Sequence, residues 1–220
     1  MREVQVTAAF SRVRHNTLNS RANPWIAEIV SGLKDDGDCG RCGSTLLTPL
    51  GDLEVILEPN KGRSWPDVLG CGHYPVFVIS HRVVEAWGGT ADLGEWVVGG
   101  RVVFLPPVPR KLEPAQAPTY FWLDGKKMLG ARLDFKKSGF VGVKFCPICG
   151  TRSDNMIATF DHHHSKPWSY VFLSGSWTGA NLFTTDLAPT TFFCTQKFME
   201  FANRHGFSNF RFEKVEKGVS

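Results

Sequence analysis

Four of the six cysteines in this 220-residue chain lie in two short motifs of the same form. Residues 39–43 read C-G-R-C-G, and residues 146–150 read C-P-I-C-G. Two thiolates at this spacing can bind one metal ion from a tight turn, and two such turns supply the four sulfurs of a closed tetrahedral zinc site. Glycine after the second cysteine tolerates the positive φ that the turn needs. The sequence therefore predicts one structural zinc ion, held by Cys39, Cys42, Cys146 and Cys149.

The other two cysteines lie outside these motifs. Cys71 and His73 form an alternative ligand pair, but the two C-x-x-C-G motifs already complete a tetrahedron. We therefore interpret Cys71 as a buried thiol and His73 as a loop residue, and whether either binds a metal stays open. Cys194 ends an apolar run and is predicted to pack in the core. A thioredoxin-like role is disfavoured for both motifs, because neither one both follows a strand and opens a helix.

Three consecutive histidines, His162, His163 and His164, follow Asp161. They are the strongest candidate for a second metal site or an acid–base site. Successive residues of one loop point in different directions, however, so three adjacent histidines rarely bind one ion together. We interpret this run as a solvated or partner-facing loop, and whether it binds a metal stays open. The chain has no Ser/His/Asp, P-loop or G-x-G-x-x-G signature, so nothing in it specifies an enzyme.

The composition is that of a globular chain, with 42% hydrophobic residues and a formal net charge of +4. No apolar stretch is long enough to cross a bilayer, and the N-terminus lacks the apolar region and cleavage site of a secretion signal. We therefore expect a cytoplasmic protein with reduced thiols and no membrane association. Basic residues concentrate at only a few points, which supports nucleic-acid binding weakly. These points are Lys126-Lys127, Lys136-Lys137 and the tail residues Lys214 and Lys217.

Apolar spacing and turn residues predict the elements of the first half. Asn23-Pro24 is typical of a helix start, and a short helix with one apolar face is predicted through Ile26, Val30 and Leu33. Strands are predicted at residues 53–57 and 75–79. Ser80 is predicted to cap a helix whose inner face is Val83, Val84 and Trp87. Gly99-Gly100, which separates two apolar runs, predicts a two-residue hairpin.

The second half is predicted to be richer in strands. A stiff proline-rich connection at residues 106–118 precedes it. Strands are expected at residues 120–123, 130–135, 140–145, 156–160 and 169–173. Residues 191–194 form another apolar run, and Thr195 then opens a helix through Phe198, Phe201, Ala202 and His205, followed by a strand through Phe210 and Phe212. Residues 1–20 show no strong period.

The two halves share an order of elements. An apolar strand, a hydroxyl cap, a basic residue, two apolar residues and a glutamate occur in this order at residues 77–86 and again at residues 192–201. A duplication and a chance match of a common motif are both open. We predict a single α+β domain over residues 1–220, β-rich with a few short helices. Its two similar lobes, residues 1–105 and 119–220, would be joined by the zinc-binding motifs.

Five stretches together resemble the double-CXXCG motif family, a set of paralogues first noted in myxobacteria. They are the two cysteine motifs, residues 65–70 (W-P-D-V-L-G), residues 78–86 (V-I-S-H-R-V-V-E-A), and residues 198–207, which run from F-M-E-F to H-G-F. The resemblance extends from the first cysteine motif to the C-terminus and leaves residues 1–25 unaccounted for. Its members are regarded as immunity proteins that neutralise a cognate toxin delivered between bacterial kin.

The resemblance implies a cytoplasmic antitoxin of a polymorphic toxin system, which binds its toxin and acts by occlusion, not catalysis. It carries over no contact residue and no oligomeric state. Exposed aromatic residues would be natural anchors for a partner. Trp168, Tyr170 and Trp177 lie in a suitably irregular region, although each one alone is more typical of a core residue.

Two other functions are kept open. The first is a zinc-ribbon nucleic-acid-binding module, in which Lys126, Lys127, Lys136 and Lys137 would contact phosphates. The second is a metallohydrolase that uses the His162–His164 loop, which requires a second bound metal.

Overall fold

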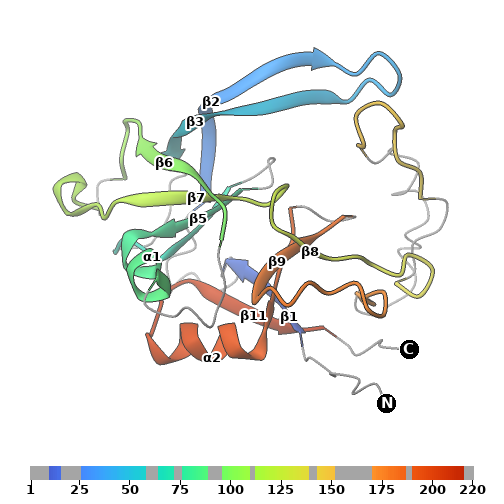
Figure 1. Cartoon of the computed structure of the whole chain (residues 1–220). Helices are drawn as coiled ribbons and strands as arrows, with labels where there is room; N and C mark the ends of the chain where they lie inside the picture. Colours follow the sequence, from blue (N-terminus) through green and yellow to red (C-terminus); the bar gives the residue numbers. More distant parts are fainter. Residues whose placement is uncertain are drawn as a thin grey trace, which may run out of the picture.

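The structure is a computed structural model that describes residues 10–15, 26–57, 64–71, 76–88, 96–109, 112–138, 143–151, 170–186 and 190–215. These residues form strands arranged in two curved sheets, together with two short α-helices (Figure 1). The α+β, β-rich class with a few short helices is confirmed. The strands are β1 (Phe10–His15), β2 (Ile26–Asp38), β3 (Thr45–Leu57), β4 (Val68–Cys71), β5 (Val76–Ser80), β6 (Val98–Phe104), β7 (Tyr120–Asp124), β8 (Leu129–Ala131), β9 (Leu182–Thr185), β10 (Phe192–Thr195) and β11 (Phe210–Lys214). The helices are α1 (His81–Gly88), α2 (Gln196–Arg204) and the 3-10 turn η2 (Pro114–Gln116).

Six strands close into a barrel in the order β2-β3-β6-β7-β5-β4. The pairs β2–β4 and β3–β6 are parallel, and the other pairs are antiparallel. Burial alternates along β3 from Leu53 to Leu57, as expected for a strand with one face turned to an apolar interior. Tyr120 and Trp122 of β7 are the largest side chains of that interior and are fully buried. The barrel therefore has a filled core and is not a channel.

The second sheet has five strands in the order β11-β1-β10-β9-β8. β1 lies between β10 and β11 and is antiparallel to both. Both faces of this sheet are covered: Phe192 and Cys194 of β10 belong to one apolar cluster, while Phe193 between them belongs to another. This alternation agrees with the period-2 geometry of a strand and explains why the whole run is buried.

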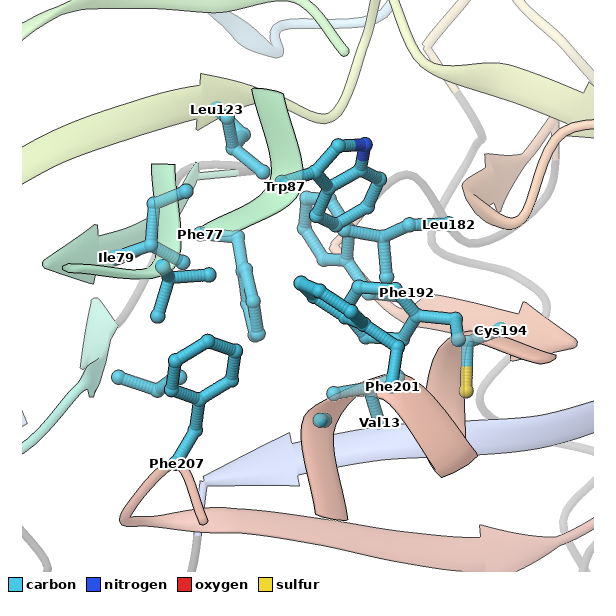
Figure 2. Packing of buried hydrophobic residues seen from close by; sticks show 14 of the residues in the cluster. Val13, Phe77, Ile79, Trp87, Leu123, Leu182, Phe192, Cys194, Phe201 and Phe207 are labelled. Atoms are coloured by element: carbon cyan, nitrogen blue, oxygen red, sulfur yellow. The ribbon is translucent and has the colours of Figure 1, made fainter. Parts of the chain in front are cut away.

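The barrel and the second sheet share an apolar core, which the two α-helices help to form (Figure 2). Phe77 and Leu123 enter it from the barrel, and Phe192 enters it from the sheet. Trp87 of α1 packs against Phe198 of α2 with 4.6 Å between ring centroids. The two helices are eight and nine residues long, and among the described residues there is no helix long and apolar enough to cross a membrane.

Both helices begin where the sequence predicts. Val83 and Trp87 of α1 are buried, and Val84 is partly buried against the same core. Thr195 is the N-cap of α2, and its side chain accepts a hydrogen bond from the backbone N–H of Phe198. The strands predicted at residues 53–57, 75–79 and 120–123 are confirmed as parts of β3, β5 and β7.

The helix predicted after Asn23-Pro24 is wrong, because residues 26–38 form strand β2. Its register against β3 shifts between Ile29 and Ser31 and again between Ser31 and Leu33. Such bulges add residues to one strand and interrupt the period of two. The apolar spacing therefore imitates a helical repeat, although Val30 is 51% exposed and does not belong to an apolar face.

The hairpin predicted at Gly99-Gly100 is also wrong, because both glycines lie inside the single strand β6. A Cβ at Gly99 would lie 2.1 Å from the ring of Trp122, and a Cβ at Gly100 would lie 2.5 Å from the carbonyl oxygen of Gly51. These glycines therefore permit close packing between strands and do not form a turn.

Three further expectations differ from the structure. β1 lies in residues where no element was predicted, since its pairing partners are far away in sequence. β8 is shorter than the strand predicted at residues 130–135. The structure describes only residues 143–145 of the strand predicted at residues 140–145, and these residues form no strand. The residues predicted as a strand at 156–160 lie outside the described residues, and at 170–173 the structure has a single bridge between Leu133 and Phe172.

Each of the two sheets contains one strand from the other half of the chain, beyond the proline-rich segment at residues 106–118. β1 lies in the sheet that otherwise comes from the second half, and β7 closes the barrel that otherwise comes from the first half. Residues 1–105 and 119–220 therefore do not coincide with the barrel and the sheet. The internal repeat stays a prediction.

Candidate metal centre

The two C-x-x-C-G motifs lie in turns that meet at the end of a long hairpin. β2 and β3 extend away from the barrel, and the turn between them carries Cys39 and Cys42 (Figure 1). Cys146 and Cys149 lie in the segment between β8 and β9. This segment is anchored by the partly buried Val143 and by ring contact between Phe145 and Phe135. The site therefore joins the tip of the hairpin to the side of the second sheet.

The two motifs adopt the same turn. The Cys39 backbone N–H donates to the Ser44 carbonyl at 2.9 Å, and the Gly43 N–H donates to the Cys39 carbonyl at 2.8 Å. The equivalent bonds in the second motif, Cys146 to Thr151 and Gly150 to Cys146, are 2.8 and 2.9 Å. Gly43 and Gly150 have φ angles of 68° and 70°, which glycine adopts without strain. Both glycines therefore have the positive φ that the C-x-x-C-G motif predicts.

The ligand atoms of the four cysteines all lie within 4.8 Å of one another. The Cys39 and Cys146 sulfurs are 3.7 Å apart, and the Cys42 and Cys149 sulfurs are 3.5 Å apart. Cys39 and Cys146 are buried, whereas Cys42 is exposed and Cys149 is partly exposed. The four predicted ligands are therefore brought together, with one cysteine of each motif on the inside and one on the outside.

The geometry fits a tetrahedral thiolate site. A zinc–sulfur distance of about 2.3 Å in a tetrahedron places its sulfurs about 3.8 Å apart. The two sulfur–sulfur distances of 3.5 and 3.7 Å are close to this separation. These residues could hold one metal ion as a closed four-cysteine site.

In the second motif, hydrogen bonds to the sulfurs favour the thiolate form that metal binding needs. Thr151, through its side chain and its backbone, lowers the pKa of the Cys149 thiol to about 6. The backbone groups of Cys149 and Ile148 lower the pKa of the Cys146 thiol. In the first motif, the Cys42 thiol donates a hydrogen bond to Ser44 Oγ at 3.3 Å. Backbone hydrogen bonds from Arg41 and Cys42 lower the pKa of the Cys39 thiol, but burial and the neighbouring sulfurs of Cys149 and Cys42 outweigh them, so that this pKa is raised. A hydroxyl residue follows the glycine in both motifs, a signal that the sequence contains and that our sequence analysis did not use.

The remaining site candidates are distributed as follows. Cys194 is fully buried in the shared core, which confirms its predicted packing role. Tyr170 is buried and Trp177 is partly buried in an apolar cluster around Phe10, so both contribute to the core. The side chain of Cys71 lies outside the described part of the chain, as do His73, Asp161, His162, His163, His164 and Trp168.

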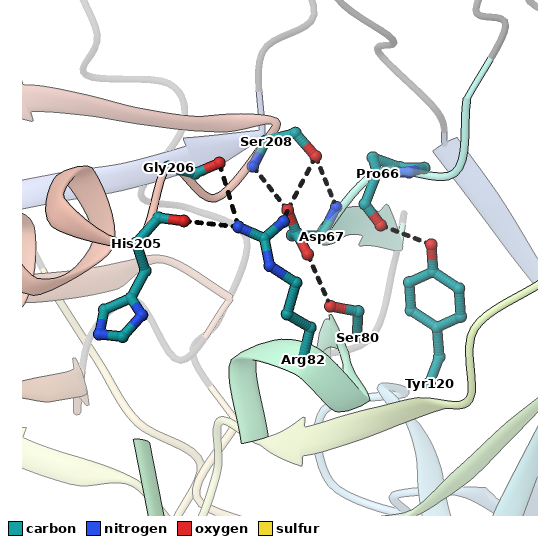
Figure 3. A network of polar contacts seen from close by, with 8 residues as sticks. All are labelled: Pro66, Asp67, Ser80, Arg82, Tyr120, His205, Gly206 and Ser208. Carbon is teal, nitrogen blue, oxygen red and sulfur yellow. Dashed lines mark hydrogen bonds and ion pairs between the residues drawn. The ribbon is translucent and has the colours of Figure 1, made fainter. Parts of the chain in front are cut away.

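A second polar site was missed by the sequence analysis. The buried carboxylate of Asp67 accepts hydrogen bonds from Ser80 Oγ at 2.9 Å and Arg82 Nη1 at 3.0 Å (Figure 3). It also accepts bonds from the backbone N–H and hydroxyl of Ser208, at 2.7 and 3.0 Å. Arg82 Nη2 donates to the carbonyl of His205 at 2.5 Å, so the guanidinium bridges to the end of α2.

This Asp67–Arg82 network unites three stretches that are far apart in the sequence. Asp67 belongs to the W-P-D-V-L-G stretch, Arg82 to the stretch that opens α1, and His205 to the stretch that ends α2. In addition, the Tyr120 hydroxyl donates to the Pro66 carbonyl (Figure 3). Burial, with a further contribution from Asp67, raises the pKa of Tyr120. The network holds the barrel against the second sheet and is structural in every contact that the described residues make.

Comparisons with known proteins add no family to these observations: no protein-family model and no curated protein matches the chain.

Proposed function

We propose that this chain is an immunity protein that binds and neutralises a cognate bacterial toxin by occlusion, in the cytoplasm, with one structural zinc ion at Cys39, Cys42, Cys146 and Cys149. The observation that supports it best is the meeting of the two C-x-x-C-G motifs in one four-sulfur site. The same two motifs carry the resemblance to the double-CXXCG family. A closed four-cysteine site is typical of structural zinc, because it leaves no open position for a substrate or a water.

The other stretches that carry the resemblance support the same interpretation. Residues 65–70, 78–86 and 198–207 converge on the Asp67–Arg82 network, which is a structural contact. The shared motifs then belong to the frame, and the partner-binding residues belong to the surface that the frame supports. A rigid frame favours an inhibitor, because little ordering of loops is needed on binding.

Rescue of growth is the direct test. The product of the neighbouring open reading frame would be expressed in a bacterial host with and without this protein, and purified pairs would be examined for a 1:1 complex. We expect rescue and a complex whose affinity depends weakly on salt. Toxicity that persists at full expression of this protein would contradict the proposal.

A nucleic-acid-binding module is the second candidate, because Lys126, Lys127, Lys136 and Lys137 are all exposed at two turns. Two of them already have acidic neighbours: Lys127 pairs with Asp124 at 3.4 Å and Lys137 with Asp134 at 3.7 Å. This candidate predicts binding to DNA or RNA that weakens steeply as salt rises. A metallohydrolase that uses His162–His164 predicts two metal ions per chain, and a measured content of one zinc would exclude it.

A further inference from the structure

The hairpin formed by β2 and β3 has two parts with different environments. Ala27, Leu53, Val55 and Leu57 are buried in the barrel. From residue 28 to residue 52, a segment that we call the arm, Cys39 at the tip is the one buried residue. Val30 and Leu50 of the arm are 51% and 69% exposed. Hydrophobic burial therefore stabilises the base of the hairpin far more than the arm.

The edges of the arm have no further strands among the described residues. β2 pairs with β4 only at Ile26 and Ala27, and β3 pairs with β6 only from Leu53 to Val55. Beyond these positions β2 and β3 pair with each other alone, from Leu33–Pro49 to Asp38–Thr45. The half-buried Ile29, Leu33 and Leu47 are its apolar contacts with the barrel core. An isolated two-stranded ribbon is marginally stable in water.

The base of the arm has the features of a hinge. Gly32 and Gly51 have φ angles of 94° and 132°, and the register of β2 on β3 shifts on both sides of Ser31. A Cβ at Gly32 would lie 2.3 Å from the carbonyl oxygen of Asp52. On the barrel side, the Gly51 carbonyl accepts a hydrogen bond from Trp122 Nε1 at 2.9 Å. The regular ladder is thus interrupted where the arm leaves a firmly held barrel strand.

The tip of the arm is held at the four-cysteine site. The sulfurs of Cys39 and Cys42 lie 3.7 and 3.5 Å from those of Cys146 and Cys149, which belong to the segment between β8 and β9. A metal ion bound by these four thiolates holds the tip of the arm to the segment between β8 and β9. The ion is connected to the barrel only through the arm. Removal of the metal leaves the arm with its few half-buried contacts.

We propose that the four-cysteine site is a latch: metal binding holds the arm against the second sheet, and loss of the metal releases the arm about Gly32 and Gly51 while the barrel stays folded. The proposal rests on the metal centre of the proposed function and does not depend on the toxin. It assigns the metal a local role, in contrast to a metal without which the whole domain unfolds. Segments with few buried contacts open locally at low free energy, and the arm is such a segment.

Hydrogen–deuterium exchange of the full chain tests the latch. The zinc-loaded protein would be compared with protein stripped by a chelator under reducing conditions, with zinc content measured on both samples. We expect the amides of residues 33–38 and 45–48 to exchange at least about tenfold faster without zinc. Amides of β5 and β7 in the barrel should stay strongly protected without zinc, although those that exchange only through global unfolding lose the metal's contribution to stability. Cys149→Ser should reproduce the effect in the presence of zinc.

Asp67→Asn serves as the control, because it weakens the frame without touching the cysteines. It should speed hydrogen–deuterium exchange in the barrel and the second sheet. Amides of the arm should not be accelerated more than the amides of those two sheets. A barrel that is left as unprotected as the arm after zinc removal would overturn the latch, because the whole fold would then require the metal. An unchanged arm would overturn it as well, because packing alone would hold the arm. If the protein binds no zinc at all, the metal centre of the proposed function fails instead.

Discussion

Asp67 and Ser208 are 141 residues apart in the chain and exchange three hydrogen bonds. The Asp67 backbone N–H donates to Ser208 Oγ at 2.9 Å, while the Ser208 backbone N–H and hydroxyl both donate to Asp67 Oδ2. Asp67 directly precedes β4 of the barrel, and Ser208 lies in the turn that precedes β11 of the second sheet. The barrel and the second sheet are therefore joined by a buried polar contact as well as by their shared apolar core.

Loss of this contact should destabilise the fold. Asp67→Asn keeps the size of the side chain but removes the charge that Arg82 and Ser208 recognise. We expect the free energy of unfolding to fall by about 2–3 kcal/mol, because buried donors lose a charged acceptor. Urea unfolding measures it. Glu85→Gln is the control, since Glu85 pairs with His81 at an exposed position. A change above about 0.5 kcal/mol is not expected there, and equal effects for the two variants would contradict the role assigned to Asp67.

Replacement of one ligand should remove the metal. We expect Cys42→Ser and Cys149→Ser to reduce the zinc content from one ion per chain to a small fraction, and to lower the melting temperature, because metal binding to the folded state adds to its stability. Elemental analysis and calorimetry measure the two effects. Cys71→Ser and His73→Ala should keep one zinc per chain. Variants of Cys42 or Cys149 that keep their full thermal stability without zinc would show that the site holds nothing together.

Metal binding should weaken in acid. The pKa of Cys149 is lowered to about 6 in the folded protein. A thiol with a lowered pKa stays a thiolate at neutral pH, and its contribution is lost as the pH falls through about 6. The affinity for zinc should therefore fall more steeply with decreasing pH below about pH 6, where Cys149 also takes up a proton, than above it.

A variant at Thr151 tests whether the pKa of Cys149 sets the pH at which zinc is lost. Thr151→Val removes the hydroxyl that contributes most to the lowered pKa of Cys149, so the midpoint of zinc loss should move to higher pH. Thr178→Val, at an exposed threonine away from the sulfurs, should leave the midpoint in place. A midpoint that does not respond to Thr151→Val would mean that another cysteine controls zinc release.

The glycines inside β6 should be intolerant of a side chain. A Cβ at Gly99 would lie 2.1 Å from Trp122, which is buried in the barrel and cannot move aside. Gly99→Ala should therefore destabilise the protein by about 2 kcal/mol or more. Gly88→Ala is the matched control, since a Cβ there would meet nothing within 4 Å and the change should stay within about 0.5 kcal/mol. Thermal or urea unfolding of the two variants distinguishes close packing at Gly99 from a general cost of replacing glycine.

The sequence by itself determined the features that depend on neighbours in the chain. The spacing within each C-x-x-C-G motif sets one turn, and the turn places both sulfurs on the same side. The N-cap at Thr195 and the apolar repeat after it set α2 in the same way, through contacts that are three or four residues apart. The β-rich class follows from many short apolar runs between turn residues, each of which can be recognised alone.

Tertiary structure alone decided the rest, because long-range pairing overrides local preference. β2 has the apolar spacing of a helix, but its backbone hydrogen bonds are satisfied by β3, and its bulges become intelligible only in that pairing. In the sequence Gly99-Gly100 is typical of a turn, but in the structure the ring of Trp122 lies against Gly99 within a strand. Asp67 and Ser208 carry no local signal of their contact, since a carboxylate finds its donors only when the barrel and the second sheet come together. The spacing of the four cysteines predicted that they come together, but only the fold decided that they bring the tip of the β2–β3 hairpin to the segment between β8 and β9.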